Sequence, residues 1–197
     1  MTPNSPESPF NAARVANSPR FLLLVICFFV SAGQLAIDIY VPALPEMARY
    51  FATSSHAIQS SVSGYMAAYA LGQLIFGPVS DAYGRKPVLA FGLVMFTIGC
   101  LLSLAAPSLE MFILARALQG FGIASTNLLA KAITTDSFSG RALMHVFTYM
   151  ATAWGVAPIV APVIGAHLQT LFGWRACLVF LLIYSIVMWA LWWHFRE

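Results

Sequence analysis

The chain has 197 residues, of which 60% are apolar and only 9% are charged, with a formal net charge of +3 at pH 7 and a mean hydropathy of +0.80. So few polar residues cannot cover a globule of this length, which excludes a soluble domain. The small positive charge forms no basic stripe, which excludes nucleic acid as a partner. The sequence therefore predicts an integral membrane protein whose surroundings are a lipid bilayer.

The first nineteen residues differ in composition from the remainder. Residues 1–19 are rich in Pro, Ser and Asn, so we expect a disordered tail there. Six apolar runs follow, and each is long enough to cross about 30 Å of hydrocarbon as a helix. These runs cover residues 21–44, 58–76, 88–106, 111–132, 143–168 and 176–193. Because their connections are short, residues 20–197 are predicted to form one bundle of antiparallel helices.

Basic residues predict the orientation of this bundle. If the first run starts in the cytoplasm, seven basic residues lie inside and two outside, which is a clear positive-inside bias. The inside set is Arg14, Arg20, Arg85, Lys86, Lys131, Arg141 and Arg196, and the outside set is Arg49 and Arg175. Both termini are therefore expected in the cytoplasm.

The connection between the second and third runs concentrates charge in the stretch GPVSDAYGRKPVL, residues 77–89. Its glycines would give the backbone freedom for a tight reversal. Its carboxylate and two cations could bond to one another and to helix ends, forming a latch at the membrane surface. A plain topology signal is the alternative, although it would not explain the spaced aspartate. The residues of the expected latch are Gly77, Asp81, Gly84, Arg85 and Lys86.

This stretch resembles the signature of the major facilitator superfamily that joins transmembrane helices 2 and 3. Further segments are similar to the bicyclomycin/chloramphenicol resistance branch of its drug:proton antiporters, and within it to the EmrD-type multidrug exporters. In chain order they read AIDIYVPALPEMARYF, RALQGFGIAS, APVIGAHL and GWRACLVFLL. Ala82 stands where the family usually has Arg, and Ala166 follows Gly165 where a second Gly is usual, so close helix packing at that point is less assured.

The resemblance implies an all-α membrane fold of six transmembrane helices, arranged as two inverted three-helix repeats and forming the amino-terminal half of a twelve-span transporter. It implies multidrug and antibiotic efflux by drug:proton antiport across the bacterial inner membrane, with no enzyme activity and no cofactor. The implied partners are amphipathic drugs, protons, and a carboxy-terminal half or a second copy of the chain. The alternative is a truncated, transport-inactive fragment or an interaction protein derived from such a transporter.

Two ionisable residues are predicted to lie deep within the bilayer, where a charge is costly. By the helical rise, Asp38 lies about 10 Å and Arg116 about 12 Å below the outer surface. A carboxylate beside a buried cation could respond to protons and substrate. The resemblance assigns proton coupling to Asp38 and to the RxxQG motif that contains Arg116, Gln119 and Gly120. A structural ion pair is the alternative.

Weaker candidates come from spacing and composition. Three residues recur at a spacing of four on the second run, and with a tyrosine of the first run they could line a substrate cavity, although ordinary packing explains them as well. They are Tyr40, Tyr65, Tyr69 and Gln73. Proline and glycine in the fifth run should kink that helix, which suits a gate. The expected gate residues are Gly155, Pro158, Pro162 and Gly165.

Other chemistry is disfavoured by the sequence. The histidines are scattered, so no metal site is expected. Asp38 has no carboxylate partner within the runs, and no G-x-S-x-G motif occurs around Ser125, so a hydrolase is not indicated. The three cysteines fall in apolar runs and are expected to be free thiols.

Overall fold

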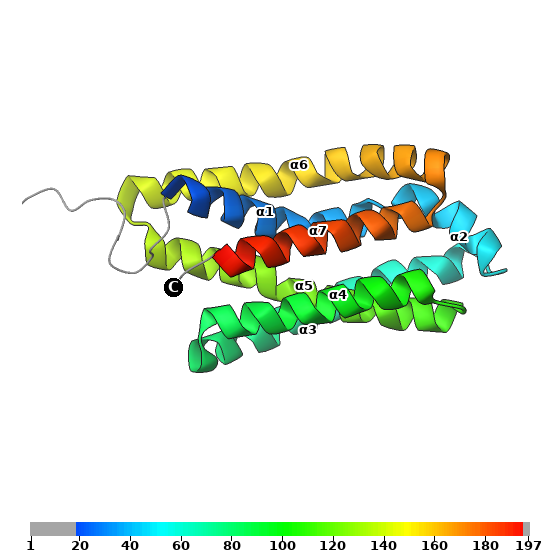
Figure 1. The fold of residues 1–197 in the computed structure, drawn as a ribbon, viewed down its shortest axis with the longest axis horizontal. Coiled ribbons are helices and arrows are strands. Elements are labelled where there is room, and N and C mark those ends of the chain that lie inside the picture. Colours follow the sequence, from blue (N-terminus) through cyan, green and yellow to red (C-terminus); the bar gives the residue numbers. More distant parts are fainter. Residues whose placement is uncertain (1–18, 195–197) are drawn as a thin grey trace, which may run out of the picture.

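The computed structural model describes residues 19–194, which form a bundle of helices (Figure 1). The elements are α1 (Pro19–Asp38), η1 (Val41–Ala43), α2 (Leu44–Tyr50), α3 (Ser55–Tyr83), α4 (Arg85–Ala105), α5 (Leu109–Ser137), α6 (Gly140–Phe172) and α7 (Arg175–His194). The predicted all-α fold with six long helices is confirmed. The expected tail, residues 1–19, lies outside the described residues except for Pro19, which begins α1.

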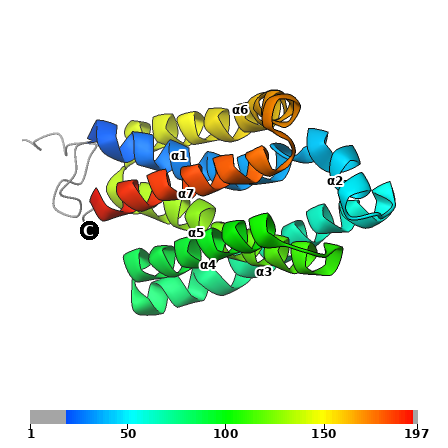
Figure 2. The same ribbon diagram turned by 45° about the vertical axis from the view of Figure 1, so that its right-hand side comes forward.

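The pairing of the helices has the pattern of an inverted repeat. α3 packs on α5 as α1 packs on α6, and α3 meets α4 as α6 meets α7. α1 also contacts α5, and α4 contacts α7. Exchanging α1, α3 and α4 for α5, α6 and α7 therefore reproduces these contacts, as expected of two related three-helix repeats. Figures 1 and 2 show the six long helices running side by side along the bundle.

Four stretches are long and apolar enough to cross a membrane by length and composition: Arg20–Tyr50, which runs from α1 through η1 to α2, and the helices α4, α6 and α7. α3 and α5 have 29 residues each and carry more polar side chains. Many polar residues of α5 are buried inside the bundle, among them Gln119, Thr126 and Asn127. Because α3 and α5 run alongside the other four helices (Figure 2), a bilayer crossed by those is crossed by these as well.

The turn between α3 and α4 is shorter than the sequence predicted. α3 continues through Gly77 and Pro78 to Tyr83, and the reversal consists of Gly84, whose φ of 88° suits glycine. The expectation that Gly77 supplies the reversal is therefore wrong. A glycine and a proline are tolerated inside a membrane helix because nearby side chains and small local adjustments satisfy the freed backbone groups.

Glycines bring the helix backbones into contact. A Cβ added at Gly120 of α5 would lie 2.2 Å from the carbonyl oxygen of Tyr65 in α3, and one at Gly122 would lie 2.5 Å from that of Gly92 in α4. A Cβ at Gly165 of α6 would lie 1.7 Å from the carbonyl oxygen of Ile39. Small residues permit such contacts between membrane helices. The packing at Gly165 is therefore tight even though Ala166 follows it.

Candidate functional site

Arg116 of α5 is fully buried, and it forms no ion pair with any residue in the described part of the chain. Its Nη2 donates to the carbonyl oxygen of Ala36 at 2.8 Å, and its Nη1 donates to Oε1 of Gln119. The guanidinium also lies over the rings of Tyr40 and Tyr65, 4.3 and 4.4 Å from their centroids. Neutral acceptors and aromatic faces thus replace a carboxylate as the partners of this buried cation.

Asp38, the last residue of α1, has a different partner. Its Oδ2 accepts a hydrogen bond of 2.7 Å from Nε2 of Gln34, one turn earlier. Among the described residues no ion pair joins Asp38 to Arg116, so the interpretation as a structural ion pair is wrong. The guanidinium meets α1 two residues earlier, at Ala36, and residues two apart on a helix do not face the same side.

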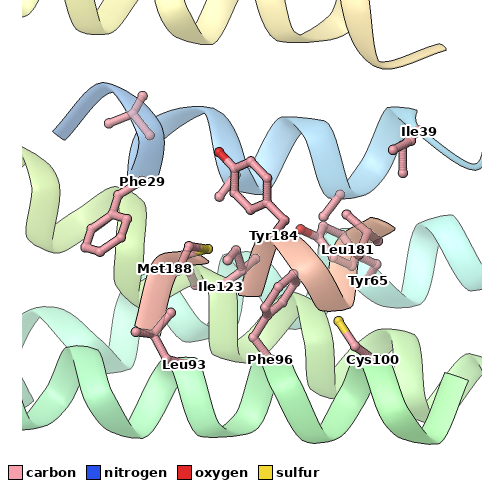
Figure 3. Close-up of a cluster of buried hydrophobic side chains, with 14 of the residues drawn as sticks. Phe29, Ile39, Tyr65, Leu93, Phe96, Cys100, Ile123, Leu181, Tyr184 and Met188 are labelled. Atoms are coloured by element: carbon pink, nitrogen blue, oxygen red, sulfur yellow. The ribbon is translucent and has the colours of Figure 1, made fainter. Parts of the chain in front are cut away.

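Gln119 connects the buried arginine to α4. While its Oε1 accepts from Arg116, its Nε2 donates to Sγ of Cys100 at 3.0 Å. A Cβ at Gly99 would lie 2.6 Å from Cγ of Gln119, so a glycine at that position lets the amide approach α4. Cys100 and Tyr65 belong to the buried cluster drawn in Figure 3. All three cysteines, Cys27 included, are free, as predicted.

A cavity of about 600 Å³ lies between α1, α3, α5 and α6. Tyr69 and Gln73 line it, and their predicted contact with a substrate stays a prediction. Tyr40 and Tyr65 do not line it and are fully buried, so those two predictions are wrong. The spacing of four places Tyr65 on the same helix face as Tyr69, but one turn along the helix its ring covers Arg116 and its hydroxyl donates to the carbonyl oxygen of Gly33.

Other residues of this cavity were missed by the sequence analysis. Its polar lining includes Gln34, Asn127 and Lys131, and its apolar lining includes Met66, Phe147, Met150 and Trp154. Asn127 donates from Nδ2 to the hydroxyl oxygen of Tyr69 at 2.7 Å. The signal that could have found two of them is the pair of polar residues at positions 127 and 131, which lie four apart in an apolar run and therefore share a helix face.

The charged stretch after α3 makes contacts that differ from the predicted latch. Arg85 forms an ion pair of 2.8 Å with Asp136, near the end of α5. Lys86 lies 5.2 Å from the ring centroid of Trp192 in α7, whose Nε1 donates to the Lys86 carbonyl oxygen. Asp81 is exposed and forms no ion pair in the described part of the chain. The predicted bonding of Asp81 to the two cations is wrong, because the turn at Gly84 directs Arg85 toward α5.

The predicted gate lies on α6, which continues as one α-helix through Pro158 and Pro162. Gly155 faces open space, with no atom within 4 Å of an added Cβ, whereas Gly165 lies against the backbone of Ile39. The gate residues therefore have two different environments, and their gating role stays a prediction. No cluster of potential metal ligands occurs within residues 19–194.

A sequence model described as Major Facilitator Superfamily matches residues 22–197. The chain is 36% identical over 162 residues to multidrug resistance protein D of Escherichia coli K12, an alignment that covers 82% of this chain and 41% of the relative. It is 31% identical over 174 residues to a chloramphenicol resistance protein of Pseudomonas aeruginosa, covering 88% and 42%. It is also 31% identical over 140 residues to a bicyclomycin resistance protein homolog of Haemophilus influenzae, covering 71% and 35%. The chain thus spans about two fifths of the length of these relatives, and the branch indicated by its motifs is confirmed.

Solved structures agree on the fold. A bacterial homolog of the human lysosomal transporter Spinster, in an inward-facing and unoccupied conformation, superposes with a TM-score of 0.71 at 15% identity, over 89% of this chain and 44% of that one. The human organic anion transporter MFSD10 (TETRAN) also gives 0.71, at 18% identity, over 92% and 48%. Transporter bundles of this kind are therefore the structural neighbours of the chain.

Proposed function

The chain belongs to the major facilitator superfamily, and from this premise we propose that it forms one six-helix bundle of a drug:proton antiporter that exports drugs across the bacterial inner membrane. The proposal is supported by a largely apolar cavity in the bundle. One residue of its lining, Gln34, is hydrogen-bonded to Asp38. Three relatives are named as resistance proteins, which supports export as the direction of transport. Membership of this family also favours a transporter over an enzyme.

The walls of the cavity suit amphipathic drugs. Met66, Phe147, Met150 and Trp154 present flexible thioethers and aromatic faces, which can adapt to ligands of different shape. A few polar groups on α1, α3 and α5 would orient such a ligand. Recognition by apolar area and shape would allow several drugs to share the site.

We propose that Asp38 binds the coupled proton and that the orientation of the Gln34 amide in the cavity depends on whether Asp38 is protonated. An ionised Asp38 can only accept, so the Gln34 amide turns its Nε2 toward the carboxylate, as observed. A protonated Asp38 gains an O–H donor, and we propose that it donates to Oε1 of Gln34, for which the amide must reverse. The group that Gln34 offers to a ligand in the cavity would then change from an acceptor to a donor. Drug binding and proton binding would thereby influence each other.

Transport by alternating access needs a second bundle that rocks against the first. We propose that the partner is a carboxy-terminal half or a second copy of this chain, and the two-fifths coverage of the relatives supports this view. α6 offers a surface for it, because its large apolar side chains Ile159, Val163 and Leu171 are exposed. Without such a partner the chain is expected to be transport-inactive.

The orientation is part of the same proposal. The α3–α4 turn, the α5–α6 turn, the start of α1 and the end of α7 lie at one end of the bundle (Figure 1). Arg20, Arg85, Lys86 and Arg141 lie at the starts of α1, α4 and α6, beside these turns, so the positive-inside rule assigns this end to the cytoplasm. Thiol reagents that cannot cross membranes test it: a cysteine introduced at Tyr83 should react only from the cytoplasmic side, and reaction from the periplasm would contradict the orientation.

The requirement for a partner is tested with the purified 197-residue chain. It is reconstituted in liposomes with an imposed pH gradient, and its oligomeric state is measured by light scattering. We expect no drug-dependent proton flux from a monomer. Flux from a demonstrated monomer would contradict the need for a second bundle, and flux from a dimer alone would identify the partner as a second copy.

A further inference from the structure

The cavity between α1, α3, α5 and α6 has an unbalanced charge. Lys131 is the one charged side chain among the described residues that line it. The carboxylates of residues 19–194 all lie outside the lining: Asp38 is held by Gln34, Asp136 is paired with Arg85, and the others are Glu46, Asp81 and Glu110. Lys131 forms no ion pair with any of them. The lining therefore carries a positive charge that no ion pair within residues 19–194 neutralises.

Polar groups gather on the same side of the cavity as this lysine. Asn127 precedes Lys131 by one turn of α5, so both lie on one helix face. Asn127 is 7% exposed, its Nδ2 donates to Tyr69, and its Oδ1 is buried without a partner in the described part of the chain. Gln73, one turn from Tyr69 on α3, completes the polar group. Lys131 is the member that is exposed and free to reach a ligand.

The large aromatic side chains of the apolar lining are on α6. Trp154 is 51% exposed and Phe147 38% exposed although both are large and apolar, and Met66 of α3 adds a flexible thioether. Aromatic and thioether side chains favour contact with a ligand's aromatic body. The cavity thus joins an aromatic wall to a cationic, hydrogen-bonding end.

Building on the proposed export function, we propose that this cavity selects amphipathic organic anions, with the negative group at Lys131 and the aromatic body against Trp154 and Phe147. An uncompensated ammonium at the edge of a low-dielectric cavity attracts an anion strongly and opposes a cation of the same shape. Asp38 does not line the cavity, and its carboxylate is hydrogen-bonded to Gln34, which does. Lipophilic cations therefore gain no matching charge on this wall.

The test uses two hydrophobic ions of nearly equal size and shape but opposite charge, tetraphenylborate and tetraphenylphosphonium. Their binding to the purified chain in detergent is measured by calorimetry, and their partition into micelles is subtracted with protein-free samples. We expect the wild-type chain to prefer tetraphenylborate by about tenfold or more. Lys131→Gln should abolish this preference and Lys131→Glu should reverse it, whereas Lys131→Arg should keep it.

Arg141→Gln is the matched control, because Arg141 is exposed at the start of α6 and does not line the cavity. If it lowers the preference as much as Lys131→Gln does, the effect is a general surface potential and the proposed subsite is wrong. Equal binding of both ions to the wild-type chain would also overturn it. Trp154→Ala should weaken both ions equally, and circular dichroism verifies that each variant is helical. Because this test needs no transport, anion preference without export in cells would refute the export function and leave the subsite standing.

Discussion

The guanidinium of Arg85, at the start of α4, forms a 2.8 Å ion pair with the carboxylate of Asp136, near the end of α5. The pair joins two helices that are already in extensive contact. It lies at the end of the bundle that holds the α3–α4 and α5–α6 turns. Its side chains are 26% and 38% exposed, so solvent screens much of the attraction.

Removing this pair should change stability little. Arg85→Gln and Asp136→Asn are each expected to lower the free energy of unfolding by about 0.2–1 kcal/mol, as is usual for exposed pairs. The exchange Arg85→Asp with Asp136→Arg should recover most of the loss. Denaturant unfolding of the three variants measures this coupling. A loss larger than about 3 kcal/mol in either single variant would show that the pair behaves as a buried one.

Two glycines of α6 provide a matched pair of substitutions. Gly165→Ala should lower the free energy of unfolding by about 1–3 kcal/mol, because its Cβ would lie 1.7 Å from the Ile39 carbonyl oxygen and push α6 away from α1. Gly155→Ala should be neutral or slightly stabilising, since its Cβ meets no atom within 4 Å and alanine favours a helix. Thermal unfolding of both variants in detergent is the measurement. Similar losses at both positions would contradict the observed packing.

Arg116 should not tolerate lysine. An ammonium cannot donate to Ala36 and Gln119 while also stacking between Tyr40 and Tyr65, as the planar guanidinium does. We expect Arg116→Lys to lower the free energy of unfolding by about 1.5–3 kcal/mol, the range for a hydrogen bond to a charged group. Arg141→Lys, at an exposed position, is the control and should have no effect. Equal stability of the two variants would contradict the requirement for the planar guanidinium at position 116.

Substitutions of Gln34 and Gln73 should distinguish the proposed drug binding from the proposed proton coupling. Both line the cavity, but Gln34 alone of the two donates to Asp38. Gln34→Leu should therefore flatten the pH dependence of drug uptake into everted vesicles, whereas Gln73→Leu should change the apparent affinity for drug and leave the pH profile in place. An unaltered pH profile in Gln34→Leu would refute its part in coupling.

Hydropathy and motif spacing were sufficient to predict the six helices and the burial of Arg116, because both depend on local composition in an apolar chain. The partners of the charged residues could not be predicted in the same way. Arg85 meets Asp136, about fifty positions later, only because α4 packs on α5. Tyr65 and Tyr69 share a face of α3, yet one covers Arg116 and the other lines the cavity. Such differences depend on which neighbouring helix packs against each turn of the helix. The spacing of residues in the sequence does not predict this packing.

Asp38 is proposed to couple drug export to proton entry. It is tested in everted vesicles from cells that express the gene encoding this chain with its flanking sequence, so that a partner bundle encoded beside it is also made. Addition of drug to energised vesicles should release protons in the wild type. Asp38→Asn should bind drug but release none, and Glu110→Gln, which removes an exposed carboxylate of α5 outside the cavity lining, should behave as the wild type. Drug-dependent proton release that persists in Asp38→Asn would contradict the account.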